Sequence, residues 1–143
     1  MPTVDVLIPT CDRPAALAVT LAGLCAQSLR EPGGAPFRVV VSDQGDTPVE
    51  AAGEVRAVLA VLRAHGHDVE LHRHLPRRGL AEQRQFLLER CRGELALFLD
   101  DDVLLEPWVL AQLTRALARE GCGFVGSAVL GLSHAGDVRP HEQ

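Results

Sequence analysis

Residues 95–103 read L-A-L-F-L-D-D-D-V: five apolar residues lead directly into three consecutive aspartates, and an apolar residue follows. A short, continuous apolar run is typical of a strand that is buried on both faces of a parallel sheet. Two carboxylates about 6 Å apart repel each other by roughly 3 kcal/mol at an effective dielectric near 20. Three aspartates at the end of a buried strand need a counter-charge or full solvation, so this stretch is a candidate binding site.

The rest of the chain alternates segments with strand patterns and segments with helix patterns. Strands are predicted at residues 4–9, 37–42, 69–74, 94–99 and 123–130. Helices are predicted at about 14–29, 48–64, 79–92 and 107–119. In the first helix Asp12 is the expected cap and Pro14 lies in the first turn. This order predicts an α/β fold, a Rossmann-like, mostly parallel sheet with helices on both faces.

Ligands of such sheets bind at the carboxyl ends of the strands, which here places the aspartate run at the expected binding edge. Alternation along an extended segment puts Asp100 and Asp102 on one side and Asp101 on the other. Mg²⁺ and Mn²⁺ prefer oxygen ligands, and Mg²⁺ is typically held by one or two carboxylates plus phosphate oxygens. One side could hold a metal while the other accepts hydrogen bonds from a ligand hydroxyl. The alternative is a solvated acidic turn that caps the next helix.

Composition excludes several classes of function. All 14 basic residues are arginines, which excludes mechanisms that need a lysine, such as a Walker-type phosphate loop or a Schiff base. The net charge of −5 gives no support for nucleic-acid binding. The four cysteines form no C-x-x-C pair, and we interpret them as reduced residues. Neither a signal peptide nor an apolar stretch of the ~20 residues that a membrane span needs is visible, so a cytoplasmic chain without a membrane span is expected.

Four motifs occur in a fixed order: V-D-V-L-I-P-T-C-D-R at 4–13, V-V-V-S-D-Q-G-D at 39–46, G-L-A-E-Q-R-Q at 79–85 and R-G-E-L-A-L-F-L-D-D-D at 92–102. Together they resemble the family-2 inverting glycosyltransferases with the A-type fold, which transfer sugars from nucleotide-sugar donors. The family's corresponding motifs are P-T-x-[ND]-R, V-V-D-[DN]-G-S, G-x-x-x-A-R-N and A-x-G-E-Y-I-x-F-L-D-D-D. The resemblance extends from Val4 to about Val129.

The resemblance implies a role for each matched residue on the nucleotide side. Pro9, Thr10 and Asp12 would line the nucleotide pocket beneath the first helix. Asp43 would hydrogen-bond the base of the donor, and Arg84 would support the base and the diphosphate. The donor that we expect on this basis is a UDP-sugar.

The resemblance also implies a separate role for each of the three consecutive aspartates. Asp101 would hold a ribose hydroxyl, and Asp102 would coordinate a divalent metal, Mn²⁺ or Mg²⁺, that bridges the diphosphate. Asp100 would support that metal, through a water molecule rather than directly. Ser42 and Gln85 depart from the family pattern, at positions where the family often has an acid and has an asparagine. These departures leave the identity of the nucleotide open.

An inverting transfer also needs a carboxylate base that takes the proton of the acceptor hydroxyl. In the family this base comes from the second half of the domain, and no candidate is evident before Gln143. We therefore interpret residues 1–143 as a single nucleotide-sugar-binding domain, the donor half of a longer glycosyltransferase, and expect it to be inactive alone. The acceptor would be a saccharide or another hydroxyl compound.

Two other functions remain open. A non-catalytic module that binds a nucleotide or a nucleotide-sugar would keep Asp43 and Asp102 without needing a base. A receiver or phosphotransfer domain is disfavoured by the absence of lysine. His72 and His74 lie on one side of a predicted strand and could bind a metal, but surface histidines are the preferred interpretation. An uncovered sheet edge would make self-association plausible.

Overall fold

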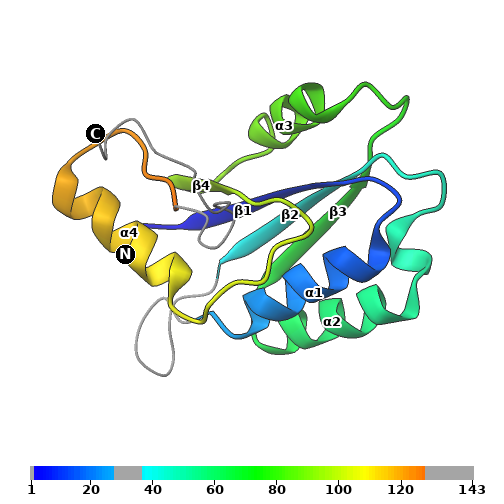
Figure 1. Ribbon diagram of the computed structural model, residues 1–143, viewed down its shortest axis with the longest axis horizontal. Coiled ribbons are helices and arrows are strands. Elements are labelled where there is room, and N and C mark those ends of the chain that lie inside the picture. The colour runs from blue at the N-terminus through cyan, green and yellow to red at the C-terminus, as the bar shows by residue number, and fades with distance from the viewer. Residues whose placement is uncertain (1, 28–36, 128–143) are drawn as a thin grey trace, which may run out of the picture. The chain divides into compact units, whose positions relative to one another are not determined.

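The computed structural model describes residues 2–27 and 37–127. Its elements follow one another in the order β1 (Val4–Thr10), α1 (Pro14–Cys25), β2 (Arg38–Asp43), η1 (Val49–Ala51), α2 (Gly53–Ala64), β3 (Asp68–Arg73), α3 (Leu80–Leu88), β4 (Leu95–Phe98) and α4 (Val109–Glu120) (Figure 1). The chain divides into two compact units, Met1–Ala111 and Gln112–Gln143, and the whole sheet belongs to the first. Among the helices of the described residues, none has the length and apolar character that a membrane crossing needs.

The four strands form one parallel sheet in the order β3-β2-β1-β4. The two central strands, β1 and β2, are buried along their whole length, which accounts for their nearly continuous apolar sequences. The chain proceeds outward from β1 to β3 on one side and then crosses to β4 on the other side. The topological switch point therefore lies between β1 and β4, which is where open α/β sheets bind their ligands.

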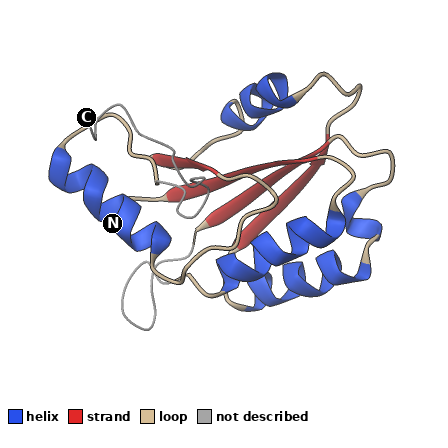
Figure 2. Cartoon of the chain, viewed as in Figure 1, coloured by secondary structure: helices blue, strands red, loops and turns tan. Residues whose placement is uncertain are grey.

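Helices cover both faces of this sheet, as the sequence predicted (Figure 2). The larger core lies on the face that α1 and α2 cover, and its helical members include Leu17, Leu21, Leu24, Val55, Leu59 and Leu62. On the other face Leu87 of α3 packs against Leu7 of β1 and Val40 of β2. Neighbouring residues of a strand point to opposite faces, so both central strands contribute to both cores.

The inward face of α3 includes a polar side chain. The apolar spacing within residues 79–92 favours an inward position for Leu80 and Leu88, yet they are 50% and 46% exposed, whereas Gln83 is buried. Gln83 Nε2 donates hydrogen bonds to the carbonyl oxygens of Thr10 (2.9 Å) and Ser42 (2.6 Å). Hydrogen bonds to buried backbone carbonyls at the ends of two strands make this inward position favourable for a polar side chain. Apolar periodicity alone does not detect it.

Several predicted elements also differ from the structure. Strand β4 was expected to be buried on both faces, but it lies at the edge of the sheet, and its Phe98 is 42% exposed. The third helix ends at Leu88 rather than at residue 92. The first helix ends at Cys25 rather than near residue 29, and residues 28 and 29 lie outside the described residues. The second helix begins at Gly53, after the short 3₁₀ turn η1, rather than at residue 48. The predicted fifth strand is absent at residues 123–127, and its remainder, 128–130, lies outside the described residues.

Candidate active site

The loops that follow β1, β2 and β4 are joined at the carboxyl edge of the sheet. The Thr10 hydroxyl donates a hydrogen bond of 2.7 Å to Asp101 Oδ2, which ties the end of β1 to the loop after β4. The Gln44 amide donates to the Thr10 carbonyl (3.0 Å), and the Leu99 amide donates to the Leu7 carbonyl (3.0 Å). The aspartate run is thus held beside the switch point between β1 and β4.

A pocket of about 250 Å³ opens at this edge. Its walls come from the ends of β1 and β2, the loop before α3, α3 itself and the loop after β4: Pro9, Thr10, Cys11, Arg13, Gln44, Arg77, Gly79, Leu80, Gln83 and Asp101. Three of the predicted site residues, Pro9, Thr10 and Asp101, are among them. Asp12 instead lines a different pocket of about 260 Å³ together with residues of the turn that leads into η1.

The three consecutive aspartates alternate between buried and exposed positions. The Asp101 side chain is 1% exposed, whereas those of Asp100 and Asp102 are 54% and 51% exposed. The alternation predicted from the sequence is therefore present in the structure. It separates one buried carboxylate beside the pocket from two carboxylates that solvent and ions can reach.

Arginines supply the counter-charge that the aspartate run requires. Arg13, which directly precedes α1, pairs through Nη2 with Asp101 Oδ1 and through Nη1 with Asp102 Oδ2 (3.0 Å). The charge of Asp101, and then that of Asp102, raises the pKa of the Arg13 guanidinium. Arg84 Nη2 donates to Asp100 Oδ1 at 2.9 Å, and Arg84 Nε is buried without a hydrogen-bond partner in the described part of the chain.

Asp43, at the end of β2, organises the turn that follows this strand. Its Oδ1 accepts the Gly45 amide (2.8 Å), and its Oδ2 accepts the Val49 amide (2.8 Å) and Arg73 Nη1 (2.6 Å). The side chain is buried and does not line the 250 Å³ pocket. The hydrogen bond from Asp43 to a base that the resemblance implies stays a prediction.

Asp12 does not cap α1, contrary to the prediction. The residue before the helix is Arg13, and no side chain caps the helix start. Asp12 has a positive φ of 55°, and its Oδ1 accepts the Asp46 amide at 2.6 Å, which is the main cause of its lowered pKa. Its Oδ2 accepts Arg77 Nη2 at 2.6 Å. The carboxylate is directed toward the β2 turn because that turn approaches closely: a Cβ on Gly45 would lie 2.7 Å from Asp12 Oδ1.

The exposed carboxylates of the aspartate run suit a metal ion whose remaining ligands come from a bound molecule and water. Within residues 2–27 and 37–127, no group of three or more His, Cys, Asp and Glu side chains could hold a metal by itself. Asp100 Oδ2 and Asp102 Oδ1 accept no hydrogen bond from the described residues, and both side chains are exposed. Two such carboxylates match the way Mg²⁺ is usually held, with the remaining ligands from phosphates and water. His72 and His74 are instead paired with Glu70 and Glu82.

Comparison with known protein families gives a match over residues 5–143, to the family described as glycosyl transferase family 2. The chain belongs to glycosyl transferase family 2. A search of curated proteins found no match. The family membership agrees with the resemblance in the four motifs.

Solved structures show that this family-2 chain has the glycosyltransferase A-type fold. The mannosyltransferase PcManGT from Pyrobaculum calidifontis, in complex with GDP-Man and Mn²⁺, matches at a TM-score of 0.64 and 23% identity over 82% of this chain. TarS of S. aureus in complex with UDP-GlcNAc matches at a TM-score of 0.65 and 18% identity over 83% of this chain. The match covers 32% of each of those chains, so this chain spans about a third of their length.

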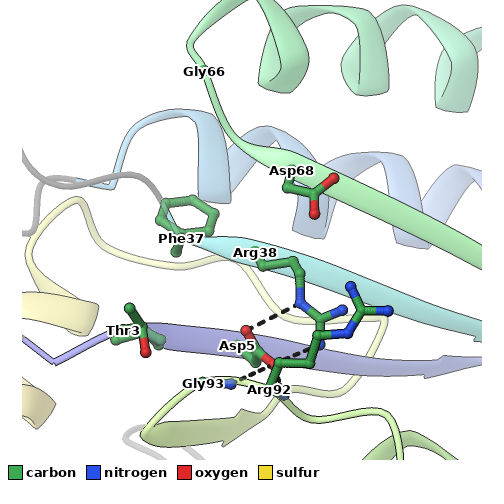
Figure 3. A pocket seen from close by; sticks show the side chains of 9 residues that line it. Thr3, Asp5, Phe37, Arg38, Gly66, Asp68, Arg92 and Gly93 are labelled. Carbon is green, nitrogen blue, oxygen red and sulfur yellow. Dashed lines mark hydrogen bonds and ion pairs between the residues drawn. The ribbon is translucent and has the colours of Figure 1, made fainter.

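A third pocket of the family-2 chain, of about 380 Å³, lies at the amino end of the sheet. Figure 3 shows Asp5 of β1 and Arg38 of β2 facing each other there. Burial raises the pKa of Asp5, but hydrogen bonds from Arg38 and from the Arg92 and Gly93 amides outweigh it and lower this pKa to about 2. Every nitrogen of the Arg38 guanidinium also donates to a carboxylate: Nε and Nη2 to Asp5, and Nη1 to Glu70. We interpret this ion pair as structural.

Sequence reasoning missed Arg13 as a partner of the aspartates. The P-T-x-[ND]-R motif contained it, but no role was assigned to it. A usable signal was present, because three adjacent carboxylates need a cation and every cation of this chain is an arginine. Arg77 of the loop before α3 also lines the pocket, and its Nη2 pairs with Asp12 and Asp46.

Proposed function

We propose that this chain binds the nucleoside diphosphate of a nucleotide-sugar donor, together with a divalent metal, at the carboxyl ends of β1, β2 and β4. In this proposal it is the donor-binding part of an inverting glycosyltransferase. The observation that carries the proposal is the arrangement of the aspartates: Asp101 is buried against Thr10 at the wall of a pocket, and its two sequence neighbours, Asp100 and Asp102, are exposed.

Asp101 is suited to accept a ribose hydroxyl. An ionised carboxylate offers about four acceptor sites, and the Thr10 hydroxyl and Arg13 use two of those on Asp101. Its fixed position in the pocket wall would orient the ribose. Asp43 would contribute through the turn that it organises, which sets the position of Gln44 in the same wall.

Asp102, supported by Asp100, would hold Mn²⁺ or Mg²⁺ together with diphosphate oxygens. Such a metal stabilises the negative charge that develops on a departing diphosphate. Arg77 lines the pocket, and Arg84, whose side chain is 42% exposed, pairs with Asp100. The planar fork of an arginine matches phosphate oxygens, so both residues are suited to a diphosphate.

The ligands of the solved relatives support this ligand class. PcManGT was solved with GDP-Man and Mn²⁺, and TarS with UDP and with UDP-GlcNAc. We propose a UDP-sugar as the donor and a saccharide or another hydroxyl compound as the acceptor. The expected transfer inverts the configuration at the anomeric carbon.

A non-catalytic nucleotide-binding module is the second candidate, and one observation favours it. Among the described residues, the carboxylate that lines the 250 Å³ pocket is that of Asp101, which is buried and already paired. It is therefore unsuited to take a proton from an acceptor hydroxyl. Release of UDP from a UDP-sugar by this chain alone, with or without an acceptor, would reject the module. Absence of release is expected for both functions, because the donor-binding part is expected to be inactive alone.

Titration calorimetry with UDP, GDP and dTDP, each with and without Mn²⁺, tests the proposal. We expect one nucleotide, UDP, to bind at least tenfold more tightly with Mn²⁺, because metal and diphosphate complete each other's coordination. Uridine is the matched control: it has no diphosphate, so Mn²⁺ should leave its affinity unchanged. A folded sample that binds none of the three nucleotides would refute the proposed function.

A further inference from the structure

One guanidinium serves two carboxylates in very different surroundings. Arg13 Nη2 pairs with Asp101, whose side chain is 1% exposed, and Arg13 Nη1 lies 3.0 Å from Asp102 Oδ2, whose side chain is 51% exposed. Arg13 itself is 54% exposed and lines the 250 Å³ pocket. It therefore stands at the boundary between the buried ribose position and the exposed metal position that the proposed function assigns.

The two arms of Arg13, the Nη1 and Nη2 groups of its guanidinium, differ in how easily their ion pairs can be broken. Removing the cation from a buried carboxylate leaves an uncompensated charge, so the arm on Asp101 is held strongly. An ion pair between exposed groups contributes little, a factor of about five at most in an equilibrium constant. The arm on Asp102 is therefore the one that another cation can displace.

We propose that Arg13 is a positioning residue. Before the ligands bind it holds the Asp102 carboxylate in place, and when they bind it gives up this ion pair for one with the diphosphate of the nucleotide-sugar. Its Nη2 stays on Asp101, while its Nη1 releases Asp102 to the incoming metal and donates to the diphosphate instead. This inference rests on the proposed function, since it needs both a metal at Asp102 and a diphosphate in the pocket. It assigns to Arg13 a role in coupling metal binding to nucleotide binding.

The neighbouring contacts agree with a change confined to one arm. The Thr10 hydroxyl keeps its own hydrogen bond to Asp101 Oδ2, so the buried carboxylate stays oriented during the exchange. The freed Nη1 remains at the wall of the pocket, because the other arm and the start of α1 fix the side chain at both ends. Hydrogen bonds to charged groups are the stronger ones, so a diphosphate is an effective new acceptor.

Arg13→Gln tests the exchange by changing two affinities in opposite directions. Mn²⁺ alone should bind about two- to fivefold more tightly, because no arginine arm competes for Asp102. UDP at saturating Mn²⁺ should bind about tenfold more weakly, because one charged donor to the diphosphate is lost. Calorimetry measures UDP, and the spectrum of free Mn²⁺ by electron paramagnetic resonance measures the metal. Circular dichroism confirms that the variant is folded.

Two variants keep the test decisive. Arg13→Lys retains the charge without the fork, so it should restore part of the UDP affinity and bind Mn²⁺ like the wild type. Arg92→Gln removes the same charge from an exposed arginine that pairs with Glu70 at the other end of the sheet, and it should change neither affinity. A fall of both affinities in Arg13→Gln, or changes equal to those of Arg92→Gln, would overturn the inference while UDP still binds the wild type. If the wild type binds no nucleotide, the proposed function fails as well.

Discussion

Asp102→Asn is expected to weaken the binding of UDP in the presence of Mn²⁺ by about 100-fold, the upper end of the effects seen when residues that support a metal ligand are changed. The substitution removes the charge that would hold the metal while keeping the size of the side chain. Without metal, the affinity for UDP should change by less than about threefold, since Asp102 does not line the pocket. Titration calorimetry with and without Mn²⁺ measures both values.

Substitutions of two further aspartates provide losses of UDP affinity with which the loss in Asp102→Asn can be compared. Asp100→Asn should cost about tenfold at most, because Asp100 is expected to act through water. Asp68→Asn removes an exposed carboxylate at the start of β3, at the amino end of the sheet, and should have no effect. Equal losses in Asp102→Asn and Asp68→Asn would contradict the assignment of the metal to Asp102.

Arg38→Met is expected to lower the free energy of unfolding by about 3–5 kcal/mol, because it leaves the buried carboxylate of Asp5 without its cation. A loss of this size is a large part of the 5–15 kcal/mol that typically stabilises a domain. Arg92→Met is the matched control: the Arg92 side chain is 73% exposed, and among the described residues its ion pair is with Glu70, so the loss should stay below about 1 kcal/mol. Urea unfolding measures both.

The same ion pair predicts a dependence on pH. The pKa of Asp5 falls from its usual 3.8 to about 2 in the folded chain, so the folded state favours the ionised form. This contribution is fully present above pH 3.8 and is lost as the pH falls toward 2. The difference between the wild type and Arg38→Met should therefore shrink across that interval. A difference that does not depend on pH would contradict the role of the Asp5 charge.

The parallel sheet could be predicted because its central strands are buried on both faces, and such strands have nearly continuous apolar sequences. The runs V-D-V-L-I-P and R-V-V-V-S have few polar residues, and both form central strands that are buried throughout. The strands therefore depend on local pattern alone. The alternation at Asp100, Asp101 and Asp102 was expected from extended geometry, but β4 ends at Phe98 and Asp101 and Asp102 lie in a turn. The contacts of Asp101 with Thr10 and Arg13 hold its carboxylate inward instead.

The partners of the site residues could not be predicted, because they depend on which loops approach one another. Asp12 occupies a position in the sequence that is typical of a helix cap. In the folded chain its carboxylate instead accepts the Asp46 amide of the β2 turn. Gln83 is polar and still faces inward, because the carbonyls of Thr10 and Ser42 at the ends of β1 and β2 accept hydrogen bonds from its side-chain amide. The cation of Asp101 is likewise set by a contact between residues 88 positions apart.

Paramagnetic broadening of backbone amide signals by Mn²⁺, in the presence of UDP, tests most directly where the donor binds. Broadening falls off steeply with distance from the ion, so a metal at Asp102 should first remove the signals of residues 10–13 and 100–103. The signals of Asp68 and Gly93, at the amino end of the sheet, should persist at the same Mn²⁺ concentration. Broadening that begins at the amino end, or that is uniform along the chain, would contradict a donor site at the carboxyl ends of β1 and β4.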